Sequence, residues 1–553
     1  MSKTIRIKPN GQVKLLVFFI FLILPITSLG KSIDGRSDHK QEIFGYADIH
    51  THLFANLAFG GKFFEGKPYD EKGIEEALSY SSYSIFDRLI VRVAELALGD
   101  GPNGKKSDQK NLENWSQNDQ VNRQTMYYEW IERSFRGGLR LLVIHAVNNE
   151  VLCKLVPKDK KSSCNDMVLV DRQIEAAYDL QDYIDKQAGG KGLGWFRIVK
   201  SSREARDVIK NGKLAVVLGI EVDSLFDCKL EKCNFAEVEK SLLEYKRRGV
   251  SHVFPVHLFD NGFSGAAIYQ TGVLTLGNLL GQGQLFKARD CSAEGIEFKI
   301  TSLGKFDGHC NSRGLSDFGR SFLTLLMKHK MIIDTDHMSK YGIDQALNLA
   351  EDYNYPLVSS HTGFLDIAKG SSRAENKKTE EQTQRILQLG GMVAPIFPKT
   401  SQKNSVAWGK VDHNCDYSIR SWAQSYLYAK DKSERWSLYP SVAFGSDLNG
   451  MITMPSARFG EKGCGGNTQQ VAEQRNPVEY PFISYDGSIS FNRLQIGKKA
   501  MDINFDGMSN VGMIPDFIAD MSNIGMNEED LAPLFRSAEG FIKMWEKVEA
   551  TEI

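Results

Sequence analysis

Short runs of apolar residues recur along the chain, and most are followed by a segment with helical periodicity. An apolar run of this length, bounded by turn residues, is typical of a buried β-strand. Eight such runs predict strands at about residues 44–50, 140–145, 213–220, 251–256, 331–335, 355–360, 391–397 and 440–446.

The segments between these runs carry apolar residues at helical spacing. They predict helices at about residues 168–187, 235–247, 315–328, 340–351 and 379–389, and one or two more over 528–548. Alternating strands and helices imply parallel strands, and eight strands imply a closed (β/α)8 barrel of the TIM type. A doubly wound open sheet is the alternative, but it explains the count of eight less well.

The remaining length is distributed unevenly. Long insertions follow the first, fourth, seventh and eighth predicted strands. Segments that follow barrel strands lie at the C-terminal face of the strands, so we expect the insertions to surround the mouth of the barrel.

The N-terminus has the order of a secretory signal. Basic residues from Lys3 to Lys14 precede an apolar run at 15–25 and small residues through Gly30. We therefore divide the chain into a signal peptide (1–30), a linker (31–42) and a barrel with embedded insertions (43–553). An uncleaved anchor is the alternative reading of 1–30. In either case we expect a secreted, periplasmic or cell-surface protein, with membrane contact only through that segment.

Composition narrows the class of partner. The 553 residues are 42% hydrophobic, and 68 Lys and Arg against 69 Asp and Glu leave a net charge of −1. No basic stripe interleaved with aromatic residues is present, so we expect no nucleic-acid partner. The oligomeric state stays open.

All eight cysteines follow the predicted signal, and their number is even. An exported chain with an even count is expected to form disulfides. Pairing between neighbours would give four local links, although many other connectivities are open. These pairs are Cys153 with Cys164, Cys228 with Cys233, Cys291 with Cys310, and Cys415 with Cys464.

Residues that bind metals stand where predicted strands end. His50 and His52 are two positions apart, so in a strand both rings point to one face and can meet one ion. The other strand ends carry Glu221, His257, His337, His361 and Asp447. Imidazole and carboxylate ligands without thiolate favour zinc, with manganese, cobalt or iron as alternatives.

The ordered motifs resemble the membrane dipeptidases, metallopeptidases of the amidohydrolase superfamily. The resemblance rests on Asp48-Ile49-His50-Thr51-His52, Gly219-Ile220-Glu221, Arg313-Gly314-Leu315, Ile333-Asp334-Thr335-Asp336-His337-Met338-Ser339, Pro356-Leu357-Val358-Ser359-Ser360-His361-Thr362 and Gly445-Ser446-Asp447-Leu448-Asn449-Gly450. These motifs extend over most of the chain from residue 43 onward.

The resemblance implies a role for each residue in a centre with two divalent ions. Glu221 would bridge the ions, with His50 and His52 on one and His337 and His361 on the other. Asp447 would be the catalytic acid and base, and His257 would polarise the substrate carbonyl. Arg373 would bind the terminal carboxylate of the substrate, for which its fork-shaped guanidinium is suited.

The implied reaction is hydrolysis of the amide bond of a dipeptide or a similar small N-acyl amino acid by a metal-bound hydroxide. One residue departs from the family, which usually carries aspartate where this chain has His52. The site would then be one charge more positive and retain anionic ligands more tightly. An amidohydrolase acting on a lactone, cyclic amide or phosphoester is one alternative, and a non-catalytic, metal-stabilised surface binding protein is another.

Overall fold

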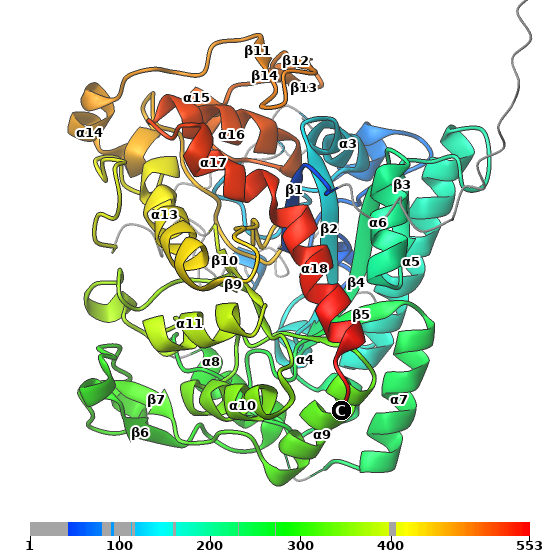
Figure 1. Cartoon of the computed structure of the whole chain (residues 1–553), viewed down its shortest axis with the longest axis vertical. Helices are drawn as coiled ribbons and strands as arrows, with labels where there is room; N and C mark the ends of the chain where they lie inside the picture. The colour runs from blue at the N-terminus through cyan, green and yellow to red at the C-terminus, as the bar shows by residue number, and fades with distance from the viewer. Residues whose placement is uncertain are drawn as a thin grey trace, which may run out of the picture. The chain divides into compact units, whose positions relative to one another are not determined.

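A parallel sheet forms the centre of the chain, as the computed structural model in Figure 1 shows. The predicted signal peptide and nearly all of the predicted linker lie outside the described residues, so that division of the N-terminus stays a prediction. The structure describes residues 42–79, 90–92, 94, 112, 115, 117–158, 162–230, 232–270, 273–397 and 405–553.

Six strands make up the main sheet, in the order β1, β2, β4, β5 and β8, with β3 paired to the first half of β4. Every pairing in it is parallel. All residues of β1 and β4 are buried, as expected for parallel strands covered on both faces. The bounds are β1 Tyr46–Thr51, β2 Leu139–Asn148, β3 Phe196–Val199, β4 Leu214–Val222, β5 Val250–Val253 and β8 Ile332–Ile333.

Two further strands, β9 (Val358–Thr362) and β10 (Met392–Pro395), form a second parallel pair. Single parallel bridges join Asp334 to Val358, Ile396 to Gly445, and Asp48 to Phe444. They link the end of β8 to β9, β10 to residue 445, and residue 444 to β1. The architecture is therefore mixed α/β with a parallel sheet, consistent with a TIM-like fold.

Seven of the eight predicted runs contain a strand, and the eighth, at 440–446, contains only bridge residues. Its backbone still pairs with β1, because the Phe444 N–H donates to the Ala47 carbonyl at 3.0 Å and the Ile49 N–H donates to the Phe444 carbonyl at 2.8 Å. The prediction missed β3, which is short and only half buried, so it lacks a long apolar run.

The predicted helices are present, and α7 has the predicted bounds. Polar side chains fix several starts: Ser339 caps α10, and Thr379 forms a capping box with Gln382 at the start of α11. The helices are α1 Ile74–Ala77, α3 Tyr128–Arg136, α4 Glu150–Leu155, α5 Asp166–Gln187, α6 Ser202–Lys210, α7 Phe235–Arg247, α8 Val273–Gln282, α9 Asp317–Lys328, α10 Lys340–Tyr353, α11 Glu380–Gln388, α13 Ile419–Trp436, α14 Thr468–Glu473, α15 Ile503–Asp506, α16 Ile514–Asn523, α17 Glu528–Phe535 and α18 Ser537–Ala550.

The insertions carry small antiparallel hairpins. One joins β6 (Ala288–Asp290) and β7 (His309–Asn311) in the segment between β5 and β8. Two more follow residue 449: β11 (Phe482–Ile483) with β12 (Ser490–Phe491), and β13 (Leu494–Ile496) with β14 (Lys499–Met501). In Figure 1 the first hairpin lies at the lower left and the other two at the top.

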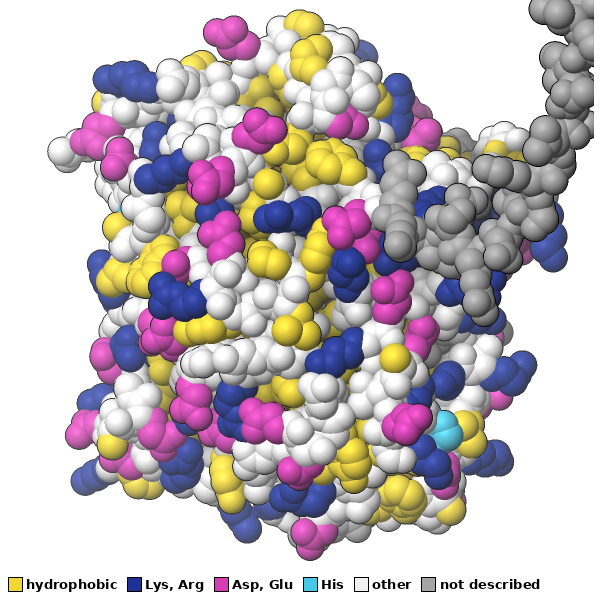
Figure 2. All heavy atoms as spheres, viewed as in Figure 1, with side chains coloured by type: hydrophobic (Ala, Val, Ile, Leu, Met, Phe, Trp, Pro, Cys, Tyr) yellow, Lys and Arg dark blue, Asp and Glu magenta, His cyan; other side chains and the backbone are white. Residues whose placement is uncertain are grey.

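All four neighbour pairings of cysteine are confirmed: Cys153–Cys164, Cys228–Cys233, Cys291–Cys310 and Cys415–Cys464. Four disulfides fit an extracellular protein. None of the helices in the described ranges has the length and apolar character needed to span a bilayer. Acidic and basic side chains are interspersed over the face shown in Figure 2, in keeping with the balanced charge.

Candidate metal centre

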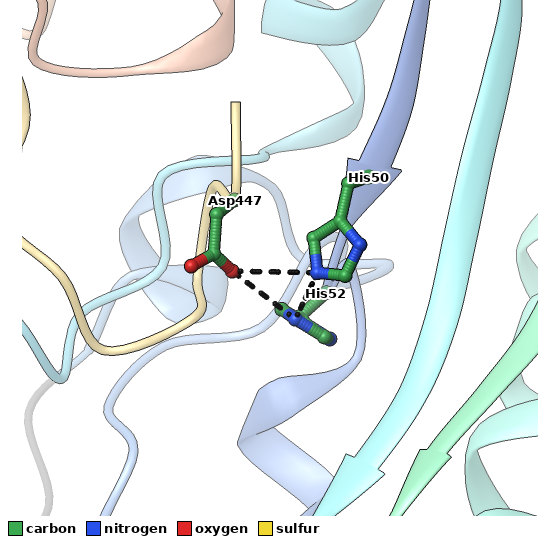
Figure 3. Close-up of side chains that lie close together, drawn as sticks. All are labelled: His50, His52 and Asp447. Atoms are coloured by element: carbon green, nitrogen blue, oxygen red, sulfur yellow. Dashed lines mark hydrogen bonds and ion pairs between the residues drawn. The ribbon is translucent and has the colours of Figure 1, made fainter. Parts of the chain in front are cut away.

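His50 and His52, at the end of β1, face Asp447, as Figure 3 shows. The Nε2 atoms of His50 and His52 lie 3.1 Å apart. Asp447 Oδ1 lies 3.6 Å from His50 Nε2 and 3.2 Å from His52 Nε2. The spacing of two residues along β1 therefore brings both rings to one face, as predicted.

Glu221, near the end of β4, adds a fourth donor to this first group. Its Oε2 atom lies 3.3 Å from His50 Nε2 and 3.2 Å from His52 Nε2. Four ligand atoms around an ion with bonds of 2.0–2.1 Å in a tetrahedron lie about 3.3 Å from one another. We call His50, His52, Asp447 and Glu221 Oε2 the first group. The spacing of His50, His52 and Glu221 Oε2 fits three corners of such a tetrahedron, which leaves one position open.

The other oxygen of Glu221 faces a second group of histidines, His337, His361 and His257. Glu221 Oε1 lies 3.1 Å from His337 Nε2, 3.8 Å from His361 Nε2 and 4.0 Å from His257 Nε2. The Nε2 atoms of His337 and His361 are 2.9 Å apart. One carboxylate is thus shared between two sets of imidazoles.

The arrangement of these donor atoms suits a divalent ion better than it suits hydrogen bonds among the side chains themselves. Glu221 Oε1 is buried and accepts no hydrogen bond among the described residues. A buried carboxylate oxygen without a partner is costly, and an ion held with the neighbouring ring nitrogens would remove that cost. The donor set contains nitrogen and oxygen atoms only, which suits zinc and other first-row divalent metals.

The far side of each histidine in the first group is held in place. His50 Nδ1 lies 3.0 Å from Ser360 Oγ, and His52 Nδ1 donates to the His145 carbonyl oxygen at 3.2 Å. A ring that donates through Nδ1 presents an unprotonated Nε2 to an ion. The ring of His145 stacks on that of His50 with centroids 4.6 Å apart, so His145 supports the site by packing.

In the second group, His361 is held by Asp336, which forms an ion pair with Lys378. Asp336 Oδ2 accepts the backbone N–H of His361 at 2.7 Å and lies 3.4 Å from its Nδ1. Lys378 donates to the other oxygen of Asp336 at 2.5 Å. Burial opposes the charge on Asp336, but the Lys378 ammonium outweighs burial and lowers the pKa of the carboxyl.

Burial and charge act in opposite directions on the ionisable groups of the centre. Burial raises the pKa of Glu221, but electrostatic attraction to the surrounding imidazoles, His50 foremost, outweighs burial and holds the pKa well below its usual range. Burial lowers the pKa of His52, yet hydrogen bonds to Asp447 and Glu221 raise it to about 10. Burial lowers the pKa of His257 to about 3 and that of His361 well below its usual value.

The backbone at the centre is strained. His337 (φ 64°) and Asp447 (φ 54°) adopt left-handed conformations, which cost about 1 to 3 kcal/mol each for residues other than glycine. Such strain is concentrated at functional sites because the surrounding structure must hold it. Gly450 leaves room for the Asp447 carboxylate, since a Cβ at that position would lie 1.8 Å from Asp447 Oδ1.

In the structure His52 lies together with the six residues predicted at strand ends, which are His50, Glu221, His257, His337, His361 and Asp447. Arg373 instead makes contacts with the backbone of neighbouring loops. Its guanidinium donates to the carbonyl oxygens of Gly295 at 2.7 Å, Leu365 at 2.9 Å and Ala368 at 3.3 Å, and Nε lies 3.4 Å from Glu297. These contacts hold two loops together. Substrate binding by Arg373 stays a prediction, and it would compete with them.

Sequence reasoning missed several residues that face or support the centre. Ser360 and Lys378 act through neighbours far away in the sequence, so no spacing pattern identifies them. Tyr269 is another: its ring lies 6.2 Å from that of His337, and its pKa is raised by burial and then by the charges of Glu221 and Asp447. Its ring therefore lies beside the second group.

No protein-family model matches the chain, and no curated protein matches it. Solved structures that resemble it include dipeptidase AC, a metallopeptidase, at 13% identity and a TM-score of 0.47, covering 92% of this chain and 99% of the other. A metallopeptidase from Rhodobacter sphaeroides, bound to a phosphinate mimic of the dipeptide L-Ala-D-Ala, gives 13% identity and 0.46, with coverage of 92% and 100%. An amidohydrolase from Pseudomonas aeruginosa gives 15% identity and 0.41, with coverage of 76% and 92%. Likeness at this level does not itself assign an activity.

Proposed function

We propose that this protein is an exported metal-dependent hydrolase that cleaves the amide bond of dipeptides or similar small N-acyl amino acids. Two divalent ions, zinc by preference, would be held by His50, His52, Glu221, His337 and His361. The three parallel bridges that lead from β8 through β9, β10 and residues 444–445 back to β1 support a closed (β/α)8 barrel as the scaffold. The centre would then lie at the C-terminal mouth of that barrel.

The observation that carries the proposal is the division of the Glu221 carboxylate between two groups of imidazoles. Oε2 faces His50 and His52 at 3.3 and 3.2 Å, and Oε1 faces His337 at 3.1 Å. A divalent ion supplies a nucleophile at neutral pH by lowering the pKa of a water, and it stabilises the developing oxyanion. A purely structural ion needs neither a shared carboxylate nor a free acid nearby.

Two side chains of the centre can move protons or orient the substrate. The Asp447 carboxylate is 10% exposed, so it can accept the proton of the attacking water and pass it to the departing amine nitrogen. His257 lies at the edge of the second group, also 10% exposed, where an N–H of its ring can donate to the substrate carbonyl.

Metal analysis of the purified protein, coupled to a substrate panel, tests this proposal. The panel contains dipeptides, some with a D-residue at the C-terminus, together with lactones and phosphoesters. We expect two equivalents of metal, hydrolysis of dipeptides that stops on chelation, and a fall in kcat of about 10²- to 10⁴-fold in Asp447→Asn. Asp207→Asn, at a carboxylate on α6 that is 54% exposed, is the matched control and should leave kcat unchanged.

Three outcomes would contradict the proposal. Turnover of lactones or phosphoesters without dipeptides would favour the alternative reaction. A metal-loaded protein that hydrolyses nothing would favour a binding protein. Equal kcat in Asp447→Asn and Asp207→Asn would remove Asp447 from the chemistry.

A further inference from the structure

The long segment between β5 and β8 places Tyr269 beside the metal centre. This segment belongs to the insertion after the fourth predicted strand, and none of the motifs behind the family resemblance contains Tyr269. The Tyr269 ring lies 6.2 Å from the ring of His337, with an angle of 50° between the two planes. A side chain of the insertion therefore reaches the second group.

The backbone that leads to Tyr269 is fixed against the segment that carries His337. The Ala267 N–H donates to the His337 carbonyl oxygen at 2.8 Å. The Ile268 N–H donates to the buried carboxylate of Glu375 at 2.7 Å. The Tyr269 ring is thus held next to His337 by the backbone before it, and its place does not depend on its hydroxyl.

The Tyr269 hydroxyl is free to bind a ligand. The side chain is partly buried, and its hydroxyl forms no hydrogen bond with any described residue. Burial raises the pKa of the phenol, and the charges of Glu221 and Asp447 raise it further. The usual pKa of a phenol is already about 10, so the hydroxyl keeps its proton at neutral pH and is available as a hydrogen-bond donor.

His257, the other candidate donor on this side, has both ring nitrogens near carboxylates. Its Nδ1 lies 3.6 Å from Asp223 Oδ1, and its Nε2 lies 4.0 Å from Glu221 Oε1. A neutral imidazole has a single N–H, and here that N–H faces a carboxylate whichever nitrogen carries it. A second donor without a carboxylate partner would complement His257 in binding a substrate oxygen.

We propose that Tyr269 donates a hydrogen bond to the oxygen of the scissile carbonyl, and that this bond strengthens as negative charge develops on that oxygen. This inference rests on the proposed function and adds a catalytic residue from the insertion. Such a donor lowers the barrier because its bond is stronger in the transition state than in the ground state.

The step balances without a change in the protonation of Tyr269. Water adds to the carbonyl carbon, and the π electrons of the C=O bond move to the oxygen that accepts the Tyr269 hydrogen bond. The C–N bond then breaks, the carbonyl re-forms, and Asp447 passes the proton taken from the water to the amine nitrogen.

Tyr269→Phe is the test, because it removes the hydroxyl and keeps the ring. We expect kcat for a dipeptide to fall about 100-fold, the effect of losing one donor to an oxyanion. KM should stay within about twofold, since the neutral carbonyl of the ground state gains little from the bond. Tyr341→Phe, at a tyrosine on α10 that is 46% exposed, is the matched control and should equal the wild type.

Binding of a phosphinate mimic of a dipeptide gives a readout without turnover. Its tetrahedral, anionic group imitates the developing oxyanion, so Tyr269→Phe should weaken its binding by a factor similar to the fall in kcat. Metal content and melting temperature should equal those of the wild type, because the hydroxyl bonds to nothing in the described part of the folded chain.

Two results would overturn the role of Tyr269 and leave the proposed function standing. One is hydrolysis of dipeptides with the same kcat in Tyr269→Phe and wild type, and the other is a lower kcat with unchanged affinity for the phosphinate. A lower kcat accompanied by loss of metal or a lower melting temperature would also overturn it, because the effect would then be structural.

The proposed function fails separately. If the wild type hydrolyses no dipeptide but binds the phosphinate more tightly than Tyr269→Phe does, the proposed function is wrong and the hydrogen bond from Tyr269 to an anion stands. A wild type that neither hydrolyses dipeptides nor binds the phosphinate would overturn both.

Discussion

The two groups that share Glu221 differ in burial and in how their rings are held. In the first group the side chains of His50 and His52 are 0% and 2% exposed, and the separations range from 3.1 to 3.6 Å. In the second group the side chain of His337 is 13% exposed, and two distances to Glu221 Oε1 reach 3.8 and 4.0 Å.

The two groups also differ in the contacts that the Nδ1 atoms of their histidines make. Both Nδ1 atoms of the first pair lie 3.0–3.2 Å from an oxygen. In the second group, Nδ1 of His361 lies 3.4 Å from Asp336 and that of His257 lies 3.6 Å from Asp223, whereas Nδ1 of His337 has no hydrogen-bond partner among the described residues. Support of this kind is worth about 10- to 100-fold in metal affinity. Under the proposed function, the first group would hold its ion more tightly, and the substrate would enter on the side of the second group.

The largest expected effect comes from Glu221→Gln, which breaks the feature that both groups share. It removes the negative charge that faces five imidazoles, and we expect metal content after dialysis to fall from two equivalents to below one. Hydrolysis should be lost with the metal. The control is Glu237→Gln on the exposed first turn of α7, which should keep both ions. Two retained ions in Glu221→Gln would disprove the sharing.

Gly450→Ala should disturb the first group and spare the second. A Cβ would lie 1.8 Å from Asp447 Oδ1 and must push that carboxylate away from His50 and His52. We expect kcat to fall at least tenfold, while the ion of the second group is retained as in the wild type, as measured by steady-state kinetics and metal analysis. Unchanged kcat would show that the position of Asp447 is not critical.

His52→Asp is the mildest change and sharpens the meaning of the departure from the family pattern. It replaces a neutral ligand by an anionic one and leaves the His145 carbonyl without its donor at 3.2 Å. We expect both ions to stay and an anionic inhibitor, such as a phosphinate, to bind several-fold more weakly because the site is one charge less positive. Equal inhibition at unchanged metal content would remove this idea.

The scaffold was predictable because its signal is local. Seven of the eight apolar runs contain a strand, because burial of a strand on both faces produces a run of apolar residues that is visible in the sequence alone. The helix α7 also has the predicted bounds. The run at 440–446 is not a strand, although its residue 444 pairs with β1 and its residue 445 pairs with residue 396 through single bridges. The short strand β3 was missed because an edge position does not require a continuous apolar run.

The centre was predictable only in part. His50 and His52 have a spacing with geometric meaning, and strand ends are a natural place to look for ligands. Nothing in the sequence shows that Lys378 pairs with Asp336, or that Arg373 is bound by three carbonyl groups. Only the folded chain brings these groups near one another.

Calorimetric titration of metal-depleted protein with zinc tests the central claim most directly, using the wild type, His50→Ala and His337→Ala. We predict two binding steps in the wild type that differ at least tenfold in affinity. His337→Ala should lose only the weaker step, and His50→Ala should lose the tighter one. A single step with one equivalent, or two equal sites that both mutations weaken alike, would contradict the account.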